Sequence, residues 1–309
     1  GHSTLMRLYY TNGSMPIRGG SHVKCAPYTS CIVTNHINHT VIHVDPEREY
    51  ITMTRKFPAV MNQIKIRDCF ELKYDTQWMG GPATRHQVWP IKKSYFNGNA
   101  YVPSGENSMH TTERYWLTSR GMYIYVNSTA PMFIDQNNSK EKYLCFIIDK
   151  KEPYMHTGDL EVSYEIGFLN NSRLAHEFFV SRHRNKPKTL PDEQVIKYPI
   201  WSTWAKYKEN INADIITNYA DEILKNGFNK SYLEIDDNWE RCYGSGEFET
   251  TKFNNVTNFI NQLKSKGFKI SLWIHPFINN GCEPAHMNAL LNNFAVKNSQ
   301  GESSIKWWR

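Results

Sequence analysis

The stretch of this sequence richest in reactive side chains is the run Leu233–Glu240, which reads LEIDDNWE. Four of its eight residues are acidic and a fifth is tryptophan. Carboxylate oxygens accept hydrogen bonds from hydroxyl groups, and an indole ring can cover the apolar face of a sugar ring. We therefore predict that Asp236, Asp237 and Trp239 bind a sugar. A solvated loop with one capping acid is the alternative that these residues leave open.

Two other segments carry side chains suited to the same pocket. The run Pro199–Trp204 ends in tryptophan, and the run Leu272–Phe277 contains His275. A histidine can donate a hydrogen bond to a sugar or to a neighbouring carboxylate. We predict that Trp204 and His275 line the pocket, although both residue types also occur as ordinary packing side chains.

The elements that would position these residues follow from apolar residues that recur every three or four positions, the spacing of helices. Each of two predicted helices ends at an x-Gly-Phe sequence, and Gly227 and Gly267 are 40 residues apart. A repeated strand–helix unit indicates a parallel sheet, and barrel enzymes assemble their sites at the C-terminal ends of such strands. The predicted strands are Pro199–Trp204, Ser231–Asp236 and Lys269–Ile274, and the predicted helices are Ala213–Lys225 and Asn255–Lys266.

The first half of the chain has a different pattern. Short segments rich in Val, Ile, Tyr and Thr, such as 40–44 and 121–126, alternate with turn sequences, and no helical period interrupts them. This pattern is typical of an antiparallel β-sandwich. We predict a β-sandwich over 1–185, a linker over 186–198 and the first part of a (β/α)8 TIM barrel over 199–309. Because a closed barrel takes about 250 residues, the barrel is expected to be truncated after about three strand–helix units.

Several motifs resemble glycoside hydrolase family 31 and, within it, the branch of myogenesis-regulating glycosidases. The resemblance implies an N-terminal β-sandwich followed by a TIM barrel, and retaining hydrolysis of an α-glycosidic bond. Retention requires two carboxyl groups about 5–5.5 Å apart, one as nucleophile and one as acid/base. The motifs are WMGGP at 78–82, HQVWP at 86–90, ERYWLTSRG at 113–121, YPIWSTWA at 198–205, LEIDDNWE at 233–240 and LWIHPFIN at 272–279.

The resemblance also implies roles for individual residues. Asp236 matches the family's second-strand aspartate, which binds sugar hydroxyls, and Trp78 resembles a residue of a sandwich loop that reaches the active site. The nucleophile and the acid/base are expected after Arg309, so no catalytic residue is predicted within the chain. Cys242 and Cys282 are expected to form a disulfide. The implied partner is an α-linked oligosaccharide or glycoconjugate, with α-galactosides as one option; the residues select neither the sugar nor an oligomeric state.

Two features favour the secretory pathway. The six cysteines are even in number, and none of them forms a C-x-x-C pair. Seven N-x-S/T acceptors occur, where chance would give roughly four. We expect an extracellular protein, or a lumenal one with a membrane anchor before Gly1. The predicted glycosylation sites are Asn12, Asn38, Asn127, Asn137, Asn170, Asn229 and Asn255.

Other classes of protein are disfavoured. The net charge of +6 gives no nucleic-acid pattern, and the basic run 182–188 is predicted to be a solvated linker. His36, His39 and His43 lack a completing ligand, so neither a metal nor a cofactor is predicted. The absence of a Gly-rich loop after the first parallel strand argues against a nucleotide-binding α/β protein. The remaining alternative to a glycosidase is a non-catalytic carbohydrate-binding protein that uses a degenerate barrel.

Overall fold

The computed structural model describes residues 6–12, 30–34, 39–45, 49–60, 64–103, 109–137, 142–154, 158–298 and 300–303. The chain divides into two compact units, unit 1 from Gly1 to Lys186 and unit 2 from Pro187 to Arg309. Each unit has a hydrophobic core of its own, so each is described separately.

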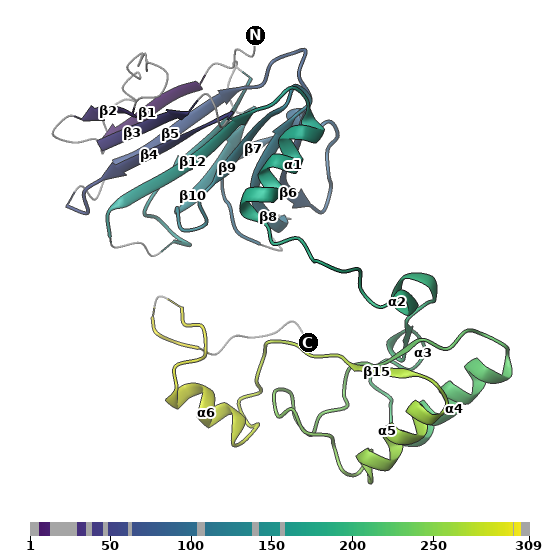
Figure 1. Cartoon of the computed structure of the whole chain (residues 1–309). Helices are drawn as coiled ribbons and strands as arrows, with labels where there is room; N and C mark the ends of the chain where they lie inside the picture. Colours follow the sequence, from purple (N-terminus) through teal and green to yellow (C-terminus); the bar gives the residue numbers. More distant parts are fainter. Residues whose placement is uncertain are drawn as a thin grey trace. The chain divides into compact units, whose positions relative to one another are not determined.

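Unit 1 consists of two antiparallel sheets (Figure 1). Its strands are β1 (Met6–Asn12), β2 (Ser30–Thr34), β3 (His39–Asp45), β4 (Tyr50–Phe57), β5 (Ile64–Glu71), β6 (Trp78–Thr84), β7 (Phe96–Ala100), β8 (Met109–Thr118), β9 (Met122–Val126), β10 (Met132–Gln136), β11 (Tyr143–Ile148) and β12 (Leu160–Phe168), with a short 3-10 helix η2 (Ile91–Lys93) before β7. A five-stranded sheet has the order β1-β5-β11-β10-β7, and a seven-stranded sheet has the order β2-β3-β4-β12-β9-β8-β6. Consecutive strands such as β4 and β5 therefore lie in different sheets.

The two sheets share one hydrophobic core. Alternation along β5 buries Ile64 and Ile66 and exposes Lys65, as expected for a strand with one face in a core. Phe70 of β5 packs edge-on against Tyr164 of β12, with ring centroids 6.4 Å apart. Because this contact joins the five-stranded sheet to the seven-stranded one, burial of apolar side chains holds the two sheets together.

A buried ion pair also connects the sheets. The Arg55 guanidinium on β4 donates to the Asp68 carboxylate on β5, and their side chains are only 2% and 0% exposed. The Tyr164 hydroxyl donates to the other Asp68 oxygen at 2.9 Å. Burial raises the pKa of Tyr164 well above its ordinary value. Buried charges require such partners, because an unpaired charge in this environment would be strongly destabilising.

A helix that the sequence pattern did not predict, α1 (Ser172–His183), covers part of the seven-stranded sheet (Figure 1). It begins after Asn171, whose side chain accepts a hydrogen bond from the Leu174 amide at 2.9 Å. The Phe179 ring stacks on Tyr115 of β8 with centroids 4.0 Å apart. The prediction that no helix interrupts the first 185 residues is wrong, because few residues of α1 are buried and its apolar period is weak.

The basic run 182–188 starts inside α1, so the prediction of a solvated linker is wrong for its first residues. Arg182 donates to Glu165 of β12 through Nε at 3.2 Å and Nη2 at 2.9 Å. The Arg182 guanidinium also lies 4.1 Å from the Tyr50 ring centroid. His183 Nε2 is 2.9 Å from a Glu165 oxygen. The charge of Glu165 and the aromatic ring thus bind this end of the helix to the sheet.

Unit 2 contains a three-stranded parallel sheet in the order β13-β14-β15. Its elements are α2 (Glu193–Lys197), β13 (Trp201–Ser202), α3 (Trp204–Tyr207), α4 (Ala213–Lys225), β14 (Tyr232–Ile235), α5 (Val256–Ser265), β15 (Lys269–Leu272) and α6 (Ala285–Leu291). Helix α4 connects β13 to β14, and α5 connects β14 to β15, as the repeat in the sequence predicts.

Local signals in the sequence determine where these elements begin and end. Helix α4 starts after Asn212, whose side chain accepts from the Ile215 amide at 2.8 Å, and it stops before Gly227, which has a φ of 73°. Leu233 and Ile235 of β14 are fully buried in the core that α4 and α5 cover. One face of the sheet is therefore apolar and packed against helices.

Of the segment predicted as a linker, 186–198, all but Lys186 belongs to unit 2. It contains α2, and Asp192 at the start of α2 pairs with Lys269 of β15 and accepts from the Tyr232 hydroxyl at 3.2 Å. The hydrogen bond from Lys269 lowers the pKa of Asp192. These contacts connect α2 to two of the three parallel strands.

Candidate functional site

The face of the parallel sheet opposite the helices carries polar side chains. Along β14, burial alternates: Leu233 and Ile235 face the helices, so Glu234 and the following Asp236 lie on the other face. The register pairs Ser202 of β13 with Glu234, and Glu234 with Ser271 of β15. A row of hydroxyl and carboxyl groups thus crosses the three strands.

Asp236 lies two residues beyond Glu234 on the same face, and its carboxylate is held by several hydrogen bonds. Its Oδ2 accepts from the Ser202 hydroxyl at 3.1 Å, and its Oδ1 accepts from the Asp237 amide at 2.7 Å. Its own amide donates to the Thr203 hydroxyl at 3.0 Å. These bonds fix the carboxylate at the C-terminal end of β14, while the residue stays partly exposed. A fixed and accessible carboxylate is a good acceptor for ligand hydroxyl groups.

Glu234 is a site residue that the sequence reasoning did not select. Burial raises its pKa, contact with Ser202 lowers it, and the hydrogen bond and negative charge of Asp236 raise it again, so that its net pKa lies above the ordinary value. Two acids that share a hydrogen bond favour retention of one proton between them. The alternation of apolar Leu233 and Ile235 with Glu234 and Asp236 is the signal that could have identified the pair.

Two of the predicted sugar-binding residues are buried. Asp237 is 1% exposed and accepts from the Tyr243 hydroxyl at 2.5 Å. Trp239 is 3% exposed, lies in the core of unit 2 and donates from Nε1 to the Trp273 carbonyl oxygen at 2.8 Å. Both side chains come after the end of β14 at Ile235, and the turn at Asn238, which has a φ of 71°, directs them into the interior of unit 2. Sugar binding by Asp237 and Trp239 stays a prediction, which their burial disfavours.

His275 lies in an aromatic cluster at the C-terminal side of β15. Its ring centroid is 4.9 Å from that of Tyr243 and 4.9 Å from that of Trp273. Its Nδ1 accepts from the Phe277 amide at 3.0 Å, which leaves Nε2 as the nitrogen that can point to a ligand. Tyr243 also bonds to Asp237, so it connects the loop after β14 to this cluster. Tyr243 and Trp273 were not among the predicted site residues.

Trp204 and Trp78 have different surroundings. Trp204 starts the short helix α3 instead of ending a strand, is partly exposed, and has the Lys208 ammonium 4.8 Å from its ring centroid. Trp78 is 2% exposed in the core of unit 1. Sugar contact by Trp78 stays a prediction, which this burial disfavours, whereas Trp204 is partly exposed.

A disulfide and the carboxylate of Glu240 stabilise the loop after β14. Cys242 and Cys282 form the disulfide that the resemblance implies, with a Cα–Cα distance of 5.6 Å. The Glu240 carboxylate accepts from the Gly244 amide at 3.0 Å and from the Gly246 amide at 2.9 Å. Both interactions shape the loop that carries Tyr243. A second disulfide, Cys69–Cys145 in unit 1, connects β5 to β11.

The predicted glycosylation sites differ in their surroundings. Asn170, Asn229 and Asn255 are exposed. Asn137 is partly buried and donates from its amide nitrogen to the carbonyl oxygens of Lys92 at 2.7 Å and Ser94 at 2.8 Å. The remaining sites are Asn127, which is partly buried, Asn12, which lies on β1 and whose side chain is not described, and Asn38, which lies outside the described residues.

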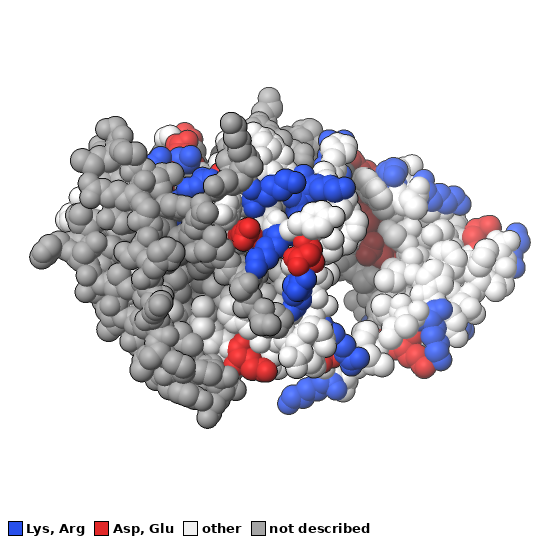
Figure 2. Space-filling model, turned by 90° about the horizontal axis from the view of Figure 1, so that it is seen from above, with Lys and Arg blue, Asp and Glu red and all other residues white. Residues whose placement is uncertain are grey.

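The described residues also bear on metal binding, membrane spans and surface charge. Among these residues no group of three His, Cys, Asp or Glu side chains has the arrangement of a metal site. No described helix has both the length and the apolar composition of a membrane span. On the described part of the face in Figure 2, acidic side chains lie among the basic ones, so the positive net charge is not one continuous surface there.

Sequence comparisons connect this site to known proteins. Residues 196–309 match the model for the TIM-barrel domain of glycosyl hydrolases family 31. The chain is 30% identical to the myogenesis-regulating glycosidase of Mus musculus over 243 residues, which are 75% of this chain and 34% of the relative. It is 27% identical to the SITS-binding protein of Tetronarce californica over 146 residues, or 45% of this chain and 20% of that protein. The chain thus spans about a third or less of these relatives.

Solved structures of similar fold are family 31 enzymes. A dextranase of Flavobacterium johnsoniae, solved with glucose, matches with a TM-score of 0.62 and 16% identity over 94% of this chain and 35% of its own. An α-xylosidase from a soil metagenome, solved with xylose, matches with a TM-score of 0.64 and 13% identity over 91% of this chain and 44% of its own. At these identities the likeness concerns the fold.

Proposed function

Because residues 196–309 belong to the TIM-barrel domain of glycosyl hydrolases family 31, we propose that the chain supplies the sugar-binding strand ends of a retaining α-glycosidase. The observation that carries the proposal is the geometry of Asp236. It stands at the C-terminal end of an inner parallel strand, and Ser202 and the Asp237 amide hold its carboxylate in one orientation. Barrel enzymes bind their substrates at these strand ends.

The proposal gives Asp236 the task of binding hydroxyl groups of one sugar ring. A carboxylate that is already hydrogen-bonded by the protein loses little conformational freedom when a ligand arrives. Glu234 lies beside Asp236 on the same face of the sheet, and burial together with this neighbouring acid raises the pKa of Glu234. The pair therefore acts as one unit, with Asp236 towards the ligand and Glu234 behind it.

The other groups of the site border the same strand ends. Trp273 and His275 follow β15, Tyr243 comes from the loop after β14, and Trp204 follows β13. Aromatic rings bind the apolar faces of sugars, and a histidine nitrogen can donate to a hydroxyl. Their task under the proposal is to orient an α-linked oligosaccharide or glycoconjugate.

The proposal assigns the bond-breaking carboxylates to other barrel strands. In a retaining enzyme one of them attacks the anomeric carbon and the other protonates the leaving oxygen. The motif resemblance expects both after Arg309. Further parts of this proposal are a β-sandwich for unit 1, a secretory location and a preference for α-galactosides.

The test is hydrolysis by the full-length natural protein that contains this chain. Aryl α-galactoside and aryl α-glucoside are offered to the wild-type protein, to Asp236→Asn and to Glu222→Gln, a control on the exposed side of α4. Loss of a charged hydrogen bond that is stronger in the transition state is expected to lower kcat/KM by about 100-fold or more for Asp236→Asn. The control should retain wild-type kcat/KM.

The outcomes separate the hypotheses. Hydrolysis that depends on Asp236 supports the glycosidase. Sugar binding without turnover favours the non-catalytic carbohydrate-binding protein. Equal activity of Asp236→Asn and the wild type would refute the assignment of Asp236 to substrate binding.

A further inference from the structure

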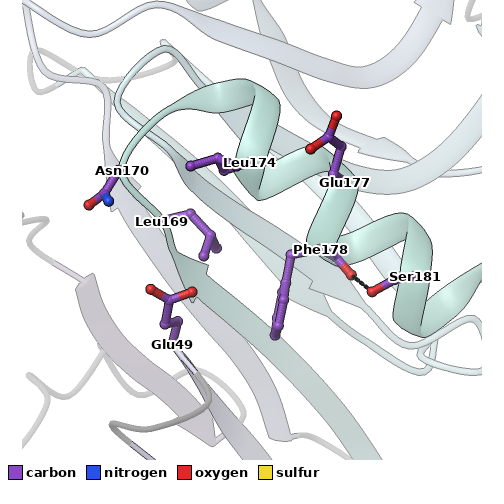
Figure 3. A pocket seen from close by; sticks show the side chains of 7 residues that line it. All are labelled: Glu49, Leu169, Asn170, Leu174, Glu177, Phe178 and Ser181. Atoms are coloured by element: carbon purple, nitrogen blue, oxygen red, sulfur yellow. Dashed lines mark hydrogen bonds between the residues drawn. The ribbon is translucent and has the colours of Figure 1, made fainter.

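An open cavity of about 350 Å³ lies in unit 1 between helix α1 and the ends of two interior strands, at the start of β4 and the end of β12 (Figure 3). Its volume is near the lower end of the roughly 300–1,000 Å³ that ligand sites occupy, which suits one sugar ring better than a longer ligand. It belongs to unit 1 and is formed separately from the residues proposed to bind substrate. Its lining residues are Glu49, Leu169, Asn170, Leu174, Glu177, Phe178 and Ser181.

The chemistry of this cavity is amphipathic. Leu169, Leu174 and Phe178 give it an apolar side, and the carboxyl groups of Glu49 and Glu177 stand at its polar edges (Figure 3). A sugar ring presents the same combination, since it has an apolar face of C–H groups and a rim of hydroxyl groups. The lining therefore fits a carbohydrate better than a purely apolar ligand.

The wall of the cavity is held in place by the helix. Phe178 lies with its ring centroid 6.0 Å from that of Tyr50, and the Arg182 guanidinium is 5.6 Å from the Phe178 ring centroid. The Ser181 hydroxyl donates to the Phe178 carbonyl oxygen at 2.7 Å. Glu177 accepts from Arg173 at 2.9 Å, so part of its negative charge is already balanced. A free cation is consequently a weaker candidate for the cavity than a neutral ligand.

Asn170 connects this cavity to a modification. It begins the sequence Asn170-Asn171-Ser172, is exposed, and lies at one end of the cavity in Figure 3. The neighbouring Asn171 is the residue whose side chain caps α1, so the cap does not need the amide of Asn170. By contrast, the amide nitrogen of Asn137 donates to two carbonyl oxygens, which a sugar on that nitrogen would displace.

We propose that Asn170 carries an N-linked glycan and that its first N-acetylglucosamine lies in this cavity, against Leu174 and Phe178. The proposal rests on the secretory location given above but not on glycosidase activity. In the transfer, the Asn170 amide nitrogen loses a proton and forms a bond to the anomeric carbon. The bond from that carbon to the diphosphate of a lipid-linked oligosaccharide donor breaks, and the lipid diphosphate leaves. Because the sugar is tethered at the rim, binding in the cavity costs little further entropy.

The first measurement is mass spectrometry of the peptide that contains Asn170, after the full-length protein has been produced in secretory eukaryotic cells. Glycan is expected at this peptide in the wild type and absent in Asn170→Gln and in Ser172→Ala. An unmodified Asn170 in the wild type overturns the proposal. This outcome would leave the hydrolysis test for Asp236 untouched, so the two failures can be told apart.

The second measurement tests whether the sugar occupies the cavity. Release of the Asn170 glycan by a peptide:N-glycosidase is timed in the native and in the denatured protein. A buried first sugar is expected to slow the native release by about tenfold or more, and Leu174→Ser, which removes apolar contact at a 43% exposed position, should abolish most of that protection. Equal release from native and denatured wild-type protein, or full protection in Leu174→Ser, would contradict a seated sugar.

Discussion

Glu165 in unit 1 and Glu234 in unit 2 are both acids on sheet strands, but their partners differ. Glu165 accepts hydrogen bonds from Tyr123 at 2.5 Å and from Arg182 at 2.9 Å, with His183 also at 2.9 Å. Burial raises its pKa, and these donors outweigh burial, so its net pKa is lowered. Glu234 has another acid beside it, and its net pKa is raised.

The difference indicates what each group is for. Two of the partners of Glu165, Arg182 and His183, lie on α1 and bind this helix to its sheet, which is a contribution to stability. Glu234 on β14 and Asp236 just after it do not stabilise the fold as a pair, because both lose solvation and each disfavours ionisation of the other. Acids in such an arrangement at the end of a barrel strand are typical of binding and catalytic sites. Glu165 has donors that balance its charge, whereas Glu234 has a second acid beside it. This contrast supports a role for Glu234 and Asp236 in binding.

The largest expected effect comes from the charges inside unit 1. Asp68→Ala leaves the Arg55 guanidinium without the carboxylate to which it donates, in a core where Arg55 is 2% exposed. We expect the free energy of unfolding to fall by about 3–5 kcal/mol. Asp75→Ala, which breaks an exposed pair with Arg120, is the control and should cost about 0–1 kcal/mol. Urea unfolding followed by circular dichroism measures both; equal losses would show that burial of the pair has no special role.

The next effect concerns the loop of unit 2 that carries Tyr243. Replacing Cys242 and Cys282 by serine opens a link between residues 40 positions apart. We expect the free energy of unfolding to fall by about 2–4 kcal/mol, because the unlinked chain gains freedom when it unfolds. Thermal unfolding with and without reductant measures the loss. Reductant should destabilise the wild type, and the double variant should lack any response that comes from this disulfide; an unchanged melting temperature in the variant would contradict the prediction.

A smaller effect is expected at Glu165. Its lowered pKa means that its stabilisation is complete above the unfolded-state pKa and is lost as the pH falls through the folded-state pKa. Glu165→Gln removes the charge from the hydrogen bonds with Arg182 and His183. The free energy of unfolding at pH 7 should therefore fall by about 1.5–3 kcal/mol. Below about pH 4.3, the ordinary pKa of glutamate, the difference between variant and wild type should shrink.

The measurement for Glu165→Gln is a series of urea unfolding curves from pH 3 to pH 7. Arg173→Gln, which breaks an exposed pair with Glu177 on the same helix, serves as the control and should change stability by about 0–1 kcal/mol at every pH. A constant difference between Glu165→Gln and the wild type across this range would be inconsistent with a lowered pKa of Glu165.

The sequence predicted the second half of the fold better than the first. Helices α4 and α5 could be predicted because their apolar spacing and their ends at Gly227 and Gly267 are local signals. Helix α1 was missed because its apolar side is narrow and its stability depends on contacts with distant strands such as β12. The Cys69–Cys145 disulfide could not be predicted either, since it depends on the register of β5 against β11.

Prediction of the site residues is limited in the same way, because burial depends on contacts that the residue type alone does not show. Choosing acids and tryptophan by type selected Asp236, which is partly exposed, together with Asp237 and Trp239, which are buried. Strand alternation accounts for Glu234, which lies on the face opposite Leu233 and Ile235. It does not account for Asp237 and Trp239, because β14 ends at Ile235 and their burial depends on the turn at Asn238, which has a φ of 71°. The contacts of Tyr243 could not be read from the sequence, because they depend on how the loop after β14 folds back.

The smallest effect is expected at Glu234, where the sign is opposite to that of Glu165. Its raised pKa means that stability falls as the pH rises from the unfolded-state pKa through the folded-state one. Glu234→Gln keeps a donor for Asp236 and removes this fall, so at pH 7 the variant should be more stable by up to about 1 kcal/mol. Urea unfolding at pH 4, 5.5 and 7 measures it, with Glu222→Gln on α4 as the control. If Glu234→Gln were destabilising at pH 7, Glu234 would be a stabilising carboxylate like Glu165, and the contrast between the two units would lose its functional meaning.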